Sequence, residues 1–204
     1  MEAPYKYISS IDYINSLTFD YVETYSFQRG TEYEDNLKMT RPEYDRLKVR
    51  KEKKDTLTEG EEIRFSELHA LFGSRQYLVN DKGQFHPSSK KINTFEQGDP
   101  IVGRLTSILR TEIKDIPMWM CTPTYRDALL FRKNSGDIVS VVNVCLSCQY
   151  METKIFNHIN GDYETYDLLR RFFIDIGHDV EDPNEFVLDD IKKMKAKQDK
   201  AKST

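Results

Sequence analysis

The sequence predicts an α+β fold, in which a mixed, mainly antiparallel sheet with a central hairpin is covered by helices. Two observations lead to this prediction. At about 126–146, two β-rich runs flank a turn that contains glycine, which is typical of an antiparallel hairpin. Apolar residues recur at helical spacing in 99–112 and 163–176, which indicates amphipathic helices with one face available to the sheet.

The central hairpin is expected to turn at 134–137, the sequence NSGD, where glycine can adopt a positive φ. A two-residue loop at this point fixes the register of the two arms. Phe131 then lies opposite Ser140, and Leu129 lies opposite Val142. The arms are apolar on both faces, so we expect them inside the sheet and not at an exposed edge.

The N-terminal part of the chain is expected to contain a helical hairpin at about 41–72. The sequence TRPE at 40–43 predicts a capping box that opens the first helix, and TEGE at 58–61 predicts another that opens the second. The first helix is basic and the second begins with acidic residues. We therefore expect these charges to face water and one another, and not phosphates.

A chain of 204 residues fits a single domain. The polar stretch at 86–91 marks the end of a predicted N-terminal subdomain, residues 1–86. A C-terminal core is expected at 99–194, with its last helix beginning at about residue 185. Residues 195–204 are charged and poor in apolar side chains, so we expect a frayed tail.

Bulk charge and composition argue against several classes of partner. Lys and Arg number 30 against 34 Asp and Glu, a net charge of −4, which disfavours wholesale binding to nucleic acid or to an anionic membrane. No run approaches the ~18 apolar residues of a membrane helix, and the first residues lack the pattern of a secretory signal. We therefore expect a cytoplasmic protein that binds another protein, with no nucleic acid or membrane as partner.

Three cysteines are the strongest candidates for chemistry in this sequence. The hairpin register carries Cys121 towards Cys148, and a bend in the strand after Cys145 would let all three sulfur atoms converge. Zinc takes four thiolate or imidazole ligands at tetrahedral angles, and His158 is the candidate for the fourth position. The sequence thus predicts either one zinc ion or no cofactor.

The spacing Cys145-x-x-Cys148 also suggests thiol redox chemistry. A strand at 139–144 leads into this motif, and 149–159 could form a helix whose N-terminus lowers the pKa of a thiol. This order of strand, CxxC motif and helix resembles that of the thioredoxins over about twenty residues. The resemblance implies a reactive Cys145, although no Trp precedes it and no Pro separates the two cysteines.

A third interpretation is that the cysteines are small buried side chains, since free cysteine is among the most buried residue types. The sequence contains no nucleophile elbow, P-loop, GxGxxG or HExxH motif. We therefore expect a binding or interaction domain, of adaptor or immunity type, in preference to an enzyme. The alternative is a zinc-dependent or thiol-redox protein that uses the CxxC motif.

Overall fold

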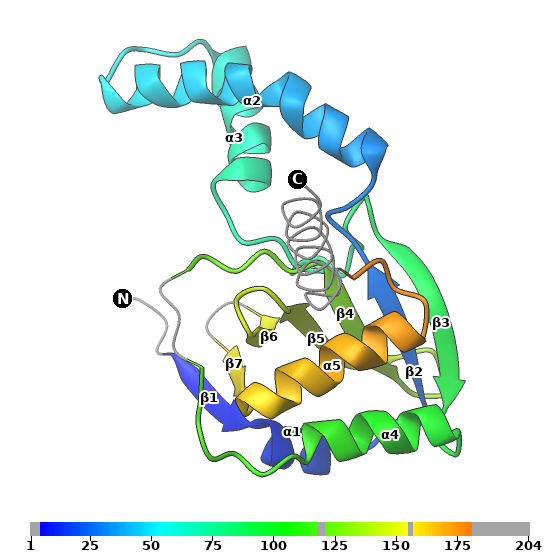
Figure 1. The fold of residues 1–204 in the computed structure, drawn as a ribbon. Helices are drawn as coiled ribbons and strands as arrows, with labels where there is room; N and C mark the ends of the chain where they lie inside the picture. The colour runs from blue at the N-terminus through cyan, green and yellow to red at the C-terminus, as the bar shows by residue number, and fades with distance from the viewer. Residues whose placement is uncertain (1–4, 118–120, 155–156, 181–204) are drawn as a thin grey trace, which may run out of the picture.

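The computed structural model describes residues 5–117, 121–154 and 157–180. Within these ranges the chain forms a seven-stranded sheet and five helices, which confirms the predicted α+β class (Figure 1). The strands are β1 (Lys6–Ser9), β2 (Tyr21–Ser26), β3 (Lys90–Glu96), β4 (Asp127–Arg132), β5 (Ile138–Cys145), β6 (Tyr150–Lys154) and β7 (Asn157–Asn160). The helices are α1 (Ser10–Ser16), α2 (Thr31–Glu52), α3 (Glu59–Phe72), α4 (Pro100–Leu109) and α5 (Tyr163–Asp175).

The strands follow the order β1-β7-β6-β5-β4-β2-β3. Only the β1–β7 pair is parallel among the pairings of this sheet. Strands β1 and β2, which come from the predicted subdomain at 1–86, therefore belong to the same sheet as the C-terminal strands. None of the helices in the described ranges combines the length and the apolar character needed to cross a membrane.

The central hairpin is formed by β4 and β5, and its predicted register is confirmed. Phe131 pairs with Ser140, and Leu129 pairs with Val142. The turn differs from the prediction, because a bulge after Phe131 shifts the register at the end of β4. The loop is therefore one residue longer than predicted, and Gly136 occupies the left-handed position (φ +89°) that such three-residue loops require.

The two faces of the sheet are covered differently. Helices α1, α4 and α5 lie on one face, where Phe131, Leu129 and Val142 join the largest apolar core of the described residues (Figure 1). The opposite face carries no helix of this group. It packs instead against loop residues, chiefly Leu78 and Tyr125, which are fully buried. This loop-covered face holds the polar groups described below.

Helices α2 and α3 form an arm that stands away from the sheet (Figure 1). The predicted start of its first helix at the TRPE sequence is wrong, because α2 already begins at Thr31 and carries Pro42 in its interior. The Thr40 hydroxyl donates to the Asn36 carbonyl instead of capping a new helix. The second prediction is confirmed, since Thr58 and Glu61 form the capping box of α3, which ends before Gly73.

The charges of the arm are paired within it. Arg50 and Lys51 of α2 form ion pairs with Glu61 and Glu62 of α3. The side chains of both pairs remain partly exposed to solvent, so each pair contributes little to stability. The pairing nevertheless follows the prediction that the basic helix faces the acidic one.

Other local predictions have mixed outcomes. The NDKG sequence at 80–83 gives only an isolated bridge between Val79 and Phe85 and no regular hairpin. Asp99 caps α4 as predicted. The predicted last helix, from about residue 185, and the predicted tail at 195–204 lie outside the described residues.

Candidate functional site on the loop-covered face of the sheet

Five polar or reactive side chains share the loop-covered face of the sheet. Cys145 of β5 is paired with Tyr150 of β6, and Asn143 is paired with Glu152. Glu152 is in turn paired with His158 of β7. Because directly opposed residues point to the same side and alternate residues of a strand share a face, all five side chains lie on one side.

Glu152 is the centre of a buried polar cluster. Its side chain is fully buried, and its carboxylate accepts a hydrogen bond from the Arg75 guanidinium at 2.8 Å. The phenol groups of Tyr77 and Tyr125 donate to the second carboxylate oxygen at 2.7 and 2.5 Å. A buried carboxylate is costly unless it is paired and hydrogen-bonded, and these three donors meet that requirement.

The cluster keeps its donors protonated. Burial raises the pKa of Tyr125 and of Tyr77, and the hydrogen bond to Glu152 raises both pKa values further. Burial by itself would lower the pKa of Arg75, but Glu152, Tyr125 and Tyr77 together outweigh it and the pKa is raised. At neutral pH Glu152 is therefore surrounded by one cation and two neutral phenols.

His158 lies beside this cluster under a cover of aromatic rings. Tyr5 and Tyr7 stack on the imidazole with centroids 5.1 Å away, and the Tyr150 ring meets it edge-on at 4.9 Å. The Nδ1 atom is 3.2 Å from a Glu152 oxygen. Neither ring nitrogen forms a hydrogen bond within the described part of the chain. His158 is thus an aromatic core residue next to a carboxylate.

The environment of His158 predicts that the protein loses stability in mild acid. Burial lowers the pKa of His158 from its ordinary value of 6.5, Arg75 lowers it further, and Glu152 opposes both. Below about pH 6.5 the unfolded chain takes up this proton while the folded chain does not, so the free energy of unfolding falls with pH down to the folded pKa. Urea unfolding of wild type and His158→Gln between pH 7.5 and 5 should give a shallower pH slope in the variant. Equal slopes would contradict this assignment.

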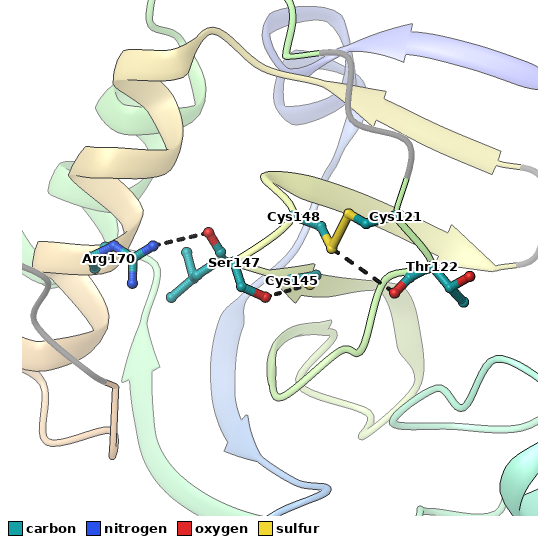
Figure 2. Close-up of a disulfide and its surroundings, with 7 residues drawn as sticks. Cys121, Thr122, Cys145, Ser147, Cys148 and Arg170 are labelled. Atoms are coloured by element: carbon teal, nitrogen blue, oxygen red, sulfur yellow. Dashed lines mark hydrogen bonds between the residues drawn. A yellow bond between two sulfur atoms is a disulfide. The ribbon is translucent and has the colours of Figure 1, made fainter.

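The cysteines meet at the end of β5. Cys121 and Cys148 form a disulfide with Cα atoms 6.5 Å apart, which confirms the prediction that the register brings these residues together (Figure 2). Cys145 is a free thiol, buried in the same apolar cluster as Cys148. Its sulfur lies 3.4 Å from the Ser147 hydroxyl. The predicted bend after Cys145 is present as the turn at 146–149.

Two features of the predicted cysteine chemistry change in the structure. The predicted helix at 149–159 is wrong, because β6 and β7 occupy most of this stretch, so among the described elements a strand and not a helix follows Cys148. His158 lies against Glu152 and the tyrosine rings, and no trio of histidine, cysteine or acidic side chains in the described ranges is placed to hold a metal ion. Because the disulfide occupies two of the predicted ligands, zinc binding to Cys121, Cys145, Cys148 and His158 stays a prediction for the reduced protein.

A second buried hydrogen-bond network joins Asp127, His178 and Thr24 in the order of a nucleophilic triad. The imidazole of His178 lies 2.8 Å from the Asp127 carboxylate and 2.9 Å from the Thr24 hydroxyl. A catalytic hydroxyl must reach a substrate, whereas Thr24 is fully buried. We therefore interpret this hydrogen-bond network as structural, because it connects the segment after α5 to β2 and β4.

A wide depression opens between the root of the arm and the loop-covered face. Its volume is about 1040 Å³. Arg75 and Tyr77, which hold Glu152, form part of its wall, and the first turn of α2 forms another part. The aromatic, arginine and histidine side chains that line it are Arg29, Tyr33, Arg75, Tyr77, Phe85 and His86. The depression, the Glu152 cluster and the disulfide therefore occupy one side of the molecule.

Sequence reasoning missed the Glu152 cluster, whose members come from three separate segments of the chain. Tyr77 and Glu152 are 75 residues apart in sequence, and Tyr125 and Glu152 are 27 apart. The one available signal was an acidic residue within a β-rich stretch that shares its face with a tyrosine two residues away.

No family model, curated protein or solved structure matches this chain.

Proposed function

We propose that this chain is a protein-binding domain that takes an extended segment of its partner in the depression at the root of the arm. The observation that carries the proposal is the size and lining of that depression. A volume of about 1040 Å³ is at the upper end of small-molecule pockets, which span roughly 300–1,000 Å³. An open depression of this size suits several consecutive residues of a polypeptide.

The lining also includes residue types that are enriched at protein interfaces. Tyrosine, phenylalanine and arginine are enriched at interfaces, and tyrosine and arginine supply many of the residues that dominate binding energy. The depression offers Tyr33, Tyr77 and Phe85 as apolar contacts.

The wall of the depression is held in place before any partner arrives. Gln76 hydrogen-bonds to the Leu71 carbonyl at the end of α3 and to the His86 ring. The Tyr33 ring meets His86 edge-on at 5.5 Å. A site whose side chains are already ordered loses less conformational entropy on binding. This order favours recognition of a defined segment.

Peptide selection tests the proposal directly. We expect the wild-type protein to enrich related linear peptides from a random library, and Tyr33→Ala and Phe85→Ala to weaken their binding at least tenfold, about 1.4 kcal/mol each. Ile63→Ala is the matched control, because Ile63 is an exposed apolar residue of α3 outside the depression. Affinities can be measured by fluorescence anisotropy of labelled peptides.

Two results would count against this function. The first is a library from which no related peptides are enriched. The second is a set of enriched peptides whose affinity falls with Ile63→Ala but not with Tyr33→Ala or Phe85→Ala, which would place the binding surface on the far part of the arm.

A further inference from the structure

The three cysteines differ in how far solvent can reach them. Cys121 is exposed, Cys148 is 9% exposed and Cys145 is 1% exposed. The disulfide therefore joins an exposed sulfur to a nearly buried one, and the free thiol lies on the buried side. An external thiol meets Cys121 first, whereas Cys145 shares with Cys148 the buried apolar cluster on the inner side of the disulfide.

Cys145 and Cys148 are joined by the turn at 146–149, which follows β5. Gln149 adopts a left-handed backbone (φ +50°), which is uncommon for a residue other than glycine, asparagine or aspartate. An Arg170 nitrogen of α5 donates to the Leu146 carbonyl at 3.0 Å and so fixes the start of the turn (Figure 2). A CxxC spacing is the one in which two cysteines can form a disulfide within a single turn.

Cys145 has a polar neighbour inside an otherwise apolar cluster. The Ser147 hydroxyl, 3.4 Å from its sulfur, can donate to the thiolate. The thiolate is the form that attacks disulfides. Ser147 is itself exposed, so its hydroxyl lies between this buried thiol and solvent.

We infer that Cys148 exchanges its disulfide partner Cys121 for Cys145 within the protein. The freed Cys121 thiol is then a site at which low-molecular-weight disulfides form mixed disulfides. The Cys145 thiolate attacks Cys148 Sγ, a Cys145–Cys148 bond forms, and the Cys121–Cys148 bond breaks. Cys121 leaves as a thiolate with the electron pair. The exchange needs no oxidant or reductant, since one disulfide replaces another.

The released Cys121 can then attack a small disulfide, R–S–S–R. A Cys121–S–R bond forms, the R–S–S–R bond breaks, and one R–S⁻ is released. This inference goes beyond the proposed binding function and does not depend on it. Its consequence for the fold is local, because exchange detaches the segment that leads from Cys121 to Tyr125 and the Glu152 cluster.

Tryptic mapping of protein purified without reductant distinguishes the two disulfides. Cleavage after Lys114, Arg126, Lys133 and Lys154 places Cys121 in peptide 115–126, and Cys145 and Cys148 together in peptide 134–154. After incubation with iodoacetamide at pH 8, exchange predicts alkylated Cys121 and an internal disulfide in 134–154. A fixed Cys121–Cys148 bond predicts the two peptides joined, with any label on Cys145.

Two variants make the test specific. Cys145→Ser should lower labelling of Cys121 at least tenfold, and Ser147→Ala, at an exposed position, should slow it several-fold without loss of the fold as followed by circular dichroism. Oxidised glutathione should give a mixed disulfide at Cys121 of the wild type. Joined peptides in the wild type, an adduct on Cys145, or Cys121 labelling that is unchanged in Cys145→Ser would each overturn the inference.

Discussion

Replacing Glu152 by alanine is expected to lower the free energy of unfolding by about 3–5 kcal/mol, because removing one partner of a buried ion pair leaves the other uncompensated. Arg75, Tyr77 and Tyr125 would each lose the carboxylate that accepts their hydrogen bond. Urea unfolding at pH 7.5, followed by circular dichroism, measures the difference. This substitution should be among the most damaging single changes on the loop-covered face.

Glu112→Ala is the matched control for this prediction. The Glu112 side chain is 79% exposed, and surface substitutions of this kind usually change stability by no more than about 0.5 kcal/mol. Should Glu152→Ala prove as mild as Glu112→Ala, the cluster would not be the buried network described above.

Loss of the disulfide is the second large effect. Cys121→Ser is expected to cost about 3–4 kcal/mol, because the bond spans 27 residues and restricts the unfolded chain. Reduction of the wild type by dithiothreitol should have the same effect and should lower the melting temperature. The measurement is the free energy of unfolding of both proteins with and without dithiothreitol.

A variant that can form no disulfide is the control for the effect of dithiothreitol. The double variant Cys121→Ser/Cys145→Ser keeps Cys148 as its single cysteine and can form no disulfide within the chain, so dithiothreitol should leave its melting temperature almost unchanged. If the wild type has the same melting temperature with and without dithiothreitol, the Cys121–Cys148 bond contributes no stability.

The elements predicted correctly are those that local interactions determine. The β4–β5 register follows from apolar arms and a glycine turn, and the α3 start follows from the reciprocal bonds of Thr58 and Glu61. The start of α2 was missed because a similar TRPE pattern lies inside a continuous helix. There the Thr40 hydroxyl bonds to the carbonyl four residues earlier and no longer signals a cap.

The candidate site was predicted only in part. The proximity of Cys121 and Cys148 was predicted by extending the hairpin register, and it is confirmed although both residues lie outside the β4–β5 ladder. The position of His158 could not, because it depends on the β6–β7 hairpin in a stretch whose sequence also suits a helix. The depression was missed for a similar reason, since it forms where α2, α3 and the loop at 76–89 meet, which no local pattern encodes.

Hydrogen exchange of the full chain with and without a selected peptide tests the binding proposal most directly. We predict slower exchange for backbone amides at 76–86 and in the first turn of α2, with no change in α4 on the opposite face of the sheet. Protection that is confined to α4 or β3, or that is absent at saturating peptide, would contradict the assignment of the depression as the binding site.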